Sequence, residues 1–172
     1  MSAALTNVHL VFGPVGAGKS TYARALAARE RGVRFAIDDW MHELFAPDPA
    51  PPMDFAWIMA RVRRCEARIR ATAADVLATG TPVVLDLGFM KAADRATFAT
   101  WARALGHAAH ALYVHAPPPV RACRVRARNA ARSDTFSFEV TPQMFEFMEH
   151  WFEPPGAAER EAATVVDTSE AA

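Results

Sequence analysis

The chain has 172 residues, a length that fits one compact domain spanning 1–172. Hydrophobic residues make up 52% of it and charged residues 22%, a balance that excludes an intrinsically disordered chain. Nineteen basic residues offset 19 acidic ones. Zero formal net charge argues against a protein whose main task is to coat nucleic acid or an anionic membrane.

Neither a leader segment nor a membrane span is predicted. Residues 1–9 lack a basic segment followed by an apolar core, and no apolar run approaches the roughly 20 residues that a membrane-spanning helix needs. Cys65 and Cys123 are isolated and form no CxxC pair. We therefore expect a cytoplasmic protein with reduced thiols and no membrane partner.

Short apolar runs alternate with helical patterns along the chain. Strands are predicted over 8–12, 33–37, 82–85, 109–115 and 164–166, and helices over 20–31, 54–79, 91–105, 117–129 and 143–152. The segments 47–52 and 132–140 are predicted to be irregular. This alternation predicts an α/β fold, in which a parallel sheet carries helices on both faces.

The first predicted turn carries a complete phosphate-binding motif. Residues 13–20 read GPVGAGKS, which matches G-x-x-x-x-G-K-[ST] between a predicted strand and a predicted helix. Glycines let backbone N–H groups converge on an anion, Lys19 reaches the β- and γ-phosphates, and Ser20 offers an oxygen to Mg²⁺. The sequence therefore predicts a nucleoside triphosphate site. Its predicted residues are Gly13, Pro14, Val15, Gly16, Ala17, Gly18, Lys19, Ser20 and Thr21.

The motif GPVGAGKST, the acids in IDDW and VVLDLGF, and the segment RVRARN together resemble the small P-loop kinases of the AAA_33 and zeta-toxin-like group. The resemblance covers about residues 8–166. It implies a three-layer α/β/α P-loop fold with five parallel strands in the order 2-3-1-4-5 and an arginine-bearing lid at about 121–140. It also implies ATP and Mg²⁺ as cofactors. The chain lacks the N-K-x-D motif that reads guanine in GTPases, which agrees with ATP.

Two adjacent acids follow the second predicted strand. The carboxyl ends of parallel strands line the crevice in which ligands bind, so Asp38 and Asp39 are expected near the phosphate loop. A carboxylate there can accept the proton of an attacking hydroxyl. The resemblance gives that base role to Asp38, while Asp39 is either a second candidate or a helix cap. Polynucleotide kinases carry an arginine where this chain has Met41, which argues against a nucleic-acid acceptor.

A third acid ends the apolar run 82–85. Asp86 resembles the Walker-B acid, which holds Mg²⁺ together with Ser20. The alternative is a capping aspartate before Gly88.

Arginines share one stripe of the helix predicted at 117–129. At 100° per residue, Arg121, Arg124, Arg128 and Arg132 fall within about 80° of one another, and Arg126 lies away from them. In similar kinases an R-x-x-x-R pair in the lid clamps the transferring phosphoryl group, and Arg124 and Arg128 match that pair. Arg121 and Arg132 are more simply explained as a solvated face.

Two other surfaces carry weaker signals. Arg61, Arg64 and Arg68 lie on the polar side of the long helix 54–79 and are candidates for binding an acidic or phosphorylated acceptor. The helix 143–152 has an apolar face, which we expect to pack in the core; the alternative is a cover over an apolar substrate. The residues of this face are Met144, Phe147, Met148 and Trp151.

These observations predict a single-domain kinase that transfers the γ-phosphoryl group of ATP to a hydroxyl of a small molecule. Lys19, Asp38, Arg124 and Arg128 would be its catalytic residues, and Ser20 and Asp86 its metal ligands. Two alternatives remain open, namely an ATP-dependent switch that hydrolyses ATP slowly without an acceptor, and a nucleic-acid end kinase. The acceptor cannot be read from the sequence, because acceptor pockets in this fold are built from variable loops.

Overall fold

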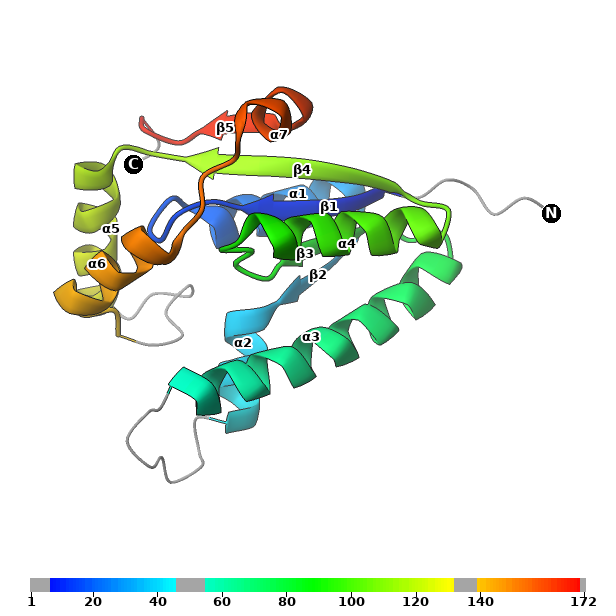
Figure 1. Ribbon diagram of the computed structural model, residues 1–172, viewed down its shortest axis with the longest axis horizontal. Helices are drawn as coiled ribbons and strands as arrows, with labels where there is room; N and C mark the ends of the chain where they lie inside the picture. The colour runs from blue at the N-terminus through cyan, green and yellow to red at the C-terminus, as the bar shows by residue number, and fades with distance from the viewer. Residues whose placement is uncertain (1–6, 46–54, 132–138, 171–172) are drawn as a thin grey trace.

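A five-stranded parallel sheet forms the centre of the protein (Figure 1). The structure is a computed structural model, and it describes residues 7–45, 55–131 and 139–170. The strands are β1 (Asn7–Phe12), β2 (Val33–Ala36), β3 (Val83–Asp86), β4 (Ala108–His115) and β5 (Thr164–Asp167). They lie in the order β2-β3-β1-β4-β5, and every neighbouring pair is parallel. The predicted fold class and strand order are confirmed.

Helices cover both faces of the sheet. The helix α1 (Lys19–Glu30) packs on one face, and α3 (Phe55–Ala78) and α4 (Ala92–Ala104) pack on the other (Figure 1). The remaining helices are α2 (Ile37–Phe45), α5 (Pro118–Ala131), α6 (Pro142–Trp151) and α7 (Ala157–Ala162). None of the helices in the described ranges is long and apolar enough to cross a membrane.

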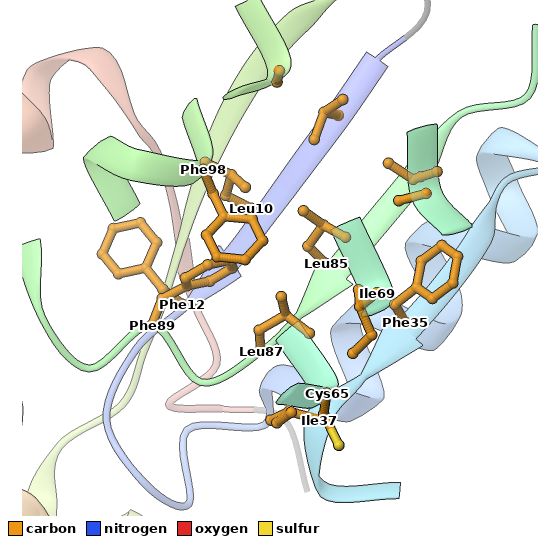
Figure 2. Packing of buried hydrophobic residues seen from close by; sticks show 14 of the residues in the cluster. Leu10, Phe12, Phe35, Ile37, Cys65, Ile69, Leu85, Leu87, Phe89 and Phe98 are labelled. Atoms are coloured by element: carbon orange, nitrogen blue, oxygen red, sulfur yellow. The ribbon is translucent and has the colours of Figure 1, made fainter. Parts of the chain in front are cut away.

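The larger core cluster lies between the sheet and the helices α3 and α4. Alternate residues of β1 enter it, among them Leu10 and Phe12, because side chains of a strand point to opposite faces in turn. They meet Ile69 from α3 and Phe98 from α4 (Figure 2). This packing fixes the strands, and with them the loops at their carboxyl ends.

The carboxyl edge of the sheet is where the chain gathers its loops and short helices. The phosphate loop follows β1, α2 follows β2 directly, and α5 and α6 lie beyond the ends of the strands (Figure 1). The second strand ends at Ala36, one residue before the predicted end, because Ile37 already begins α2. This edge of the sheet therefore carries the phosphate loop, the three predicted acids and the described part of the arginine-bearing helix α5.

Two expectations about the C-terminal half need correction. The prediction that the apolar face of α6 packs in the core is wrong, since none of its residues is buried and Phe147 is 53% exposed. Its rings meet one another and Phe55 instead, with Phe147 stacked on Trp151. The helix α7 was not predicted, because six residues are too few to show a helical period. The segment 47–52 and most of 132–140 lie outside the described residues.

Candidate functional site

The phosphate loop, residues 13–18, joins the buried strand β1 to α1 as the motif requires. Two of its glycines are needed for close packing. A Cβ atom at Gly13 would lie 2.0 Å from the carbonyl oxygen of Val114 on β4, and one at Gly16 would lie 2.7 Å from that of Arg121 on α5. Both residues also have positive φ angles. The loop is thus clamped between β4 and α5.

Lys19 begins α1 and turns back over the loop. Its ammonium group donates a hydrogen bond of 2.9 Å to the carbonyl oxygen of Pro14, and its side chain is half-buried. Burial lowers the pKa of Lys19, and the nearby carboxylates of Asp86 and Asp38 oppose that effect. Lys19 is therefore already folded over the cradle in which a phosphate would lie.

Arg34 of β2 joins two of the predicted acids, a contact that was not predicted. Its Nη2 and Nε atoms donate to Oδ2 of Asp86 at 2.7 and 3.2 Å, and its Nη1 donates to Oδ2 of Asp39 at 2.9 Å. Asp86 is buried at the end of β3, and Asp39 lies in the first turn of α2. Asp39 therefore pairs with the arginine instead of capping its helix with a free carboxylate.

Asp38 stands apart from this pair. Within the described part of the chain, no hydrogen bond or ion pair holds its carboxylate, and the residue is exposed. Protein atoms nevertheless crowd it, and this desolvation raises the pKa of Asp38. Asp86 raises the pKa further, while Lys19 and Arg128 lower it. These influences indicate that Asp38 lies among the charged groups of the phosphate loop and of α5.

Arg121 corrects the expectation of a solvated arginine stripe on α5. Its side chain is only 4% exposed. It donates to the carbonyl oxygens of Ala116 and Val15 at 2.8 and 3.1 Å and forms a two-pronged ion pair with Glu149 of α6. The stripe faces the phosphate loop, so its first arginine becomes a structural link between α5, the loop and α6. Arg132 lies outside the described residues.

The two predicted clamp arginines have different surroundings. Arg124 is half-buried and donates to the hydroxyl and the carbonyl oxygen of Thr168, beyond β5. The Thr168 hydroxyl lies 2.8 Å from the carbonyl oxygen of Ala17 and 3.1 Å from that of His115, and its single hydrogen can be donated to either of them. Arg128 has a buried Nε atom with no hydrogen-bond partner among the described residues. Burial lowers the pKa of Arg128, and Asp38 opposes that shift. Arg128 thus combines an open donor with a position near Asp38.

The three arginines of α3 that were predicted as candidates for binding an acceptor also differ in their surroundings. Arg61 stacks its guanidinium 3.3 Å from the ring centre of Trp57, and its Nε atom is buried without a partner in the described ranges. Arg64 and Arg68 are exposed. Only Arg61 therefore lies in a protected setting with unused donor capacity.

Ser20 and Asp86 supply a donor set that fits Mg²⁺. No group of three or more His, Cys, Asp or Glu side chains in the described residues could hold a metal ion. Mg²⁺ beside a nucleotide uses only one or two protein oxygens, because phosphates and water fill the rest of its shell. The Arg34 bonds go to Oδ2 of Asp86, so that pair does not use Oδ1. The Ser20 hydroxyl and this carboxylate would hold the ion.

Sequence reasoning identified the loop and the acids but missed their supports. Arg34, Thr168 and Glu149 act through partners 52, 151 and 28 positions away, respectively. No spacing rule connects residues at such separations. The one available signal was for Arg34, which is a charged residue in a strand predicted to be buried.

A phosphate loop at the carboxyl edge of five parallel strands ordered 2-3-1-4-5 defines a P-loop NTPase fold of the kinase type. A profile of the AAA domain family AAA_33 matches residues 8–155, so the chain belongs to that family. The protein is a small P-loop kinase-like protein. No curated protein shows a significant sequence match to the chain.

Solved structures share this fold at low sequence identity. A Chloroflexus aurantiacus protein described as a candidate kinase is similar with a TM-score of 0.73 and 18% identity, over 99% of this chain and 88% of that one. Kti12 of Chaetomium thermophilum, in complex with ADP-AlF3, is similar with a TM-score of 0.68 and 16% identity, over 95% of this chain and 89% of that one. A gluconokinase of Sinorhizobium meliloti is similar with a TM-score of 0.62 and 17% identity, over 99% of this chain and 86% of that one.

Proposed function

We propose that this protein is an ATP-dependent kinase that phosphorylates a hydroxyl of a small molecule. The observation that carries the proposal is the placement of Asp38. This carboxylate has no partner in the described residues, yet it lies within the electrostatic reach of Lys19, Asp86 and Arg128. A group in that position can receive a proton from a hydroxyl that attacks the γ-phosphate.

The proposed reaction forms a bond between the acceptor oxygen and the γ-phosphorus and breaks the bond from that phosphorus to the β,γ-bridging oxygen. ADP is the leaving group, and the hydroxyl proton goes to Asp38. Backbone N–H groups of the phosphate loop and Lys19 hold the phosphates, while Arg128 meets the charge on the transferred group. Bound Mg²⁺ supplies further neutralisation of the β- and γ-phosphates.

The acceptor side of the proposed site favours an acidic small molecule. Arg61 is stacked on Trp57 and lies 5.4 Å from the ring centre of Phe45, the last residue of α2, whose first turn contains Asp38. An arginine with a buried, unpaired Nε atom is suited to bind a carboxylate or phosphate.

A second candidate function is an ATP-dependent switch that has no acceptor. The likeness to Kti12, solved in complex with ADP-AlF3, supports nucleotide binding, and the shared fold does not distinguish a switch from a kinase. A nucleic-acid end kinase is a weaker alternative, because the chain has zero formal net charge and Met41 in place of an arginine.

A phosphoryl-transfer screen with labelled ATP tests the proposal. The acceptors are sugars, sugar acids, sugar phosphates, nucleosides and oligonucleotide ends, and the variant Asp38→Asn is the control. We expect transfer to one small-molecule class, loss of that transfer in the variant, and nearly equal ATP affinity in both proteins. Wild-type protein that hydrolyses ATP but labels no acceptor would favour the switch.

A further inference from the structure

Arg34 is a largely buried arginine that contacts two acids of the site, Asp39 and Asp86, and it has no role in the reaction proposed above. Its side chain is 14% exposed, and it bridges a carboxylate of the sheet and a carboxylate of α2. We propose that Arg34 is a positioning residue with two tasks. It fixes Asp86 at the metal position, and it holds Asp39 away from the acceptor, so that only Asp38 contacts the acceptor hydroxyl. The part of this inference that concerns the acceptor rests on the proposed kinase function.

The sheet register explains why Arg34 reaches Asp86. Arg34 pairs with Val84 and Ala36 pairs with Asp86, so Arg34 lies two residues before the partner of Asp86 on the same face of the sheet. A long side chain at that position extends along the strands toward their carboxyl ends. The Arg34 guanidinium therefore reaches Asp86 along the sheet, where both side chains are largely shielded from solvent.

The shape of the guanidinium allows one residue to hold two acids. Its Nη2 and Nε atoms address Asp86, and its Nη1 atom addresses Asp39. A planar fork with five donors can span two carboxylates in fixed directions, whereas the ammonium group of lysine is a single point of charge. Substitution by lysine should therefore preserve the charge but not the bridge.

The helix geometry explains how the bridge distinguishes two adjacent aspartates. Successive residues of a helix point about 100° apart, so Asp38 and Asp39 cannot both face Arg34. Asp39 takes the bond even though its side chain is 40% exposed. Asp38 then points elsewhere, and Lys19 and Arg128 act on it. The bridge thus sets the rotation of α2 about its own axis at the residue that would serve as base.

The first test concerns Asp86 and needs no acceptor. Calorimetry measures the ATP dissociation constant with Mg²⁺ and with EDTA, and the ratio of the two gives the enhancement by the metal. If Arg34 positions Asp86, Arg34→Gln should lower that enhancement about tenfold, as is usual when the partner of a metal ligand is removed. Arg29→Gln, an exposed arginine on α1, should leave it unchanged. An unchanged or larger enhancement in Arg34→Gln would overturn the inference, since a larger one means that Arg34 competes with the metal.

The second test concerns Asp39 and uses the phosphorylated acceptor. We expect Asp39→Asn and Arg34→Gln each to lower kcat about tenfold with little effect on the ATP dissociation constant in EDTA. The double variant should be no slower than the slower single variant, because both changes remove the same constraint. Arg34→Lys should recover only part of the loss. Additive effects, or full activity with lysine, would overturn this role.

The two tests also separate this inference from the proposed function. If no acceptor is found, the kinase proposal fails, while the metal enhancement in Arg34→Gln still decides the role of Arg34 toward Asp86. If Arg34→Gln does not fold, Arg34→Lys and Asp39→Asn carry the same tests. Asp39→Asn leaves the bond between Arg34 and Asp86 in place and should keep the metal enhancement of the wild type.

Discussion

Arg124 and Arg128 lie about one turn apart on α5 but differ in their neighbours. Arg124 is bonded to Thr168, whereas Arg128 has an unused buried donor near Asp38. If Arg128 meets charge that develops during transfer, its contribution is larger in the transition state than in the ground state. We expect Arg128→Ala to lower kcat by roughly 100-fold with little change in the KM for ATP, measured by steady-state kinetics.

The control for Arg128 lies on the same helix. Arg126 is exposed, so Arg126→Ala should leave both constants nearly unchanged. Arg128→Lys should restore part of the activity, because a point charge cannot reproduce the guanidinium fork. Equal losses in Arg126→Ala and Arg128→Ala would contradict a specific role for Arg128.

Lys19 gives a second prediction at a single residue. Hydrogen bonds to charged groups contribute about 1.5–3 kcal/mol, so Lys19→Ala should weaken Mg-ATP binding at least about tenfold by calorimetry. Lys91, the only other lysine, pairs with Glu153, and Lys91→Ala is the matched control. Equal ATP affinity in the wild type and Lys19→Ala would contradict a phosphate-binding role for the loop.

Asp38 should make the stability of the protein depend on pH. Its pKa in the folded state is raised, so the folded protein binds this proton more tightly than the unfolded chain does. Ionisation of Asp38 therefore costs stability as the pH rises from the ordinary carboxyl value of about 4 through the raised pKa. We expect Asp38→Asn to have a higher thermal midpoint than the wild type at neutral pH.

The difference between Asp38→Asn and the wild type should shrink as the pH falls below about 4, where the carboxyl group is neutral in both states. Thermal unfolding followed by circular dichroism over pH 3–8 measures it. A variant that is less stable than the wild type at neutral pH would show that the carboxylate is stabilised in the fold. Loss of transfer together with a gain of stability is the pattern expected of a catalytic group.

The roles of single residues could be predicted from the sequence where those roles depend on local spacing. The loop 13–20 could be predicted because its chemistry needs fixed spacing within eight residues. Arg34 could not, because its role comes from the pairing of β2 with β3, which the spacing does not encode. Arg121 was misjudged for the same reason, since a stripe of charge does not say whether it faces water or protein.

Arg121 is a buried link between the helix α5 and its neighbours. This buried guanidinium joins α5 to the loop carbonyl of Val15 and to Glu149 of α6. Removal of one partner from a buried ion pair leaves the other without compensation, at a cost of about 3 kcal/mol. We expect Arg121→Ala to lower the free energy of unfolding by about that amount, measured in urea.

Arg126→Ala is again the matched control, because exposed substitutions usually change stability by less than about 0.5 kcal/mol. Glu149→Gln should lower the free energy of unfolding by an amount between those of Arg121→Ala and Arg126→Ala, since the glutamate is 26% exposed and water can reach it. Equal stability of Arg121→Ala and the wild type would mean that the link between α5 and α6 is not needed for folding.

Helices were predicted well where they have a long apolar period. The helix α3 buries Cys65, Ile69, Ala73 and Leu77, and its predicted range differs from the observed one by a single residue at each end. The range of α6 was also predicted to within one residue, but its apolar face packs beside solvent and not in the core. The helix α7 was not predicted, because it is too short for a period. A helical pattern indicates which face is apolar, but not what covers that face.

At the scale of the whole molecule, hydrogen bonds link the edge of the sheet at β5 to the phosphate loop and to α5. Thr168 follows β5 and connects the carbonyl oxygens of Ala17 and His115 with Arg124. Thr168→Val removes the hydroxyl and keeps the shape, so it should lower the free energy of unfolding by about 1–3 kcal/mol and weaken ATP binding. Urea unfolding and calorimetry measure the two effects.

Ser169 provides the comparison for Thr168. Its hydroxyl bonds only to the exposed Asp167 among the described residues, and Ser169→Ala should change stability by less than about 0.5 kcal/mol. If Thr168→Val binds ATP as tightly as Ser169→Ala does, the phosphate loop does not depend on this edge of the sheet.

The whole architecture was predictable in two separate steps. Alternation of strands and helices is enough for a parallel sheet with two covered faces, because apolar strands need cover on both sides. The strand order came from the resemblance to P-loop kinases, since no pattern within the chain states which strands are neighbours. The lid, at about 121–140, is described only in part.

The bond from Thr168 to Ala17 also bears on how the protein is made. A ribosome completes the phosphate loop early, when residues 13–20 leave it, but the residue that supports this loop comes nearly 150 positions later. A nascent chain that lacks β5 therefore has the whole motif without its far support. Nucleotide added during synthesis should stabilise the chain only after residue 168 has emerged, so binding of ATP would select finished molecules over unfinished ones.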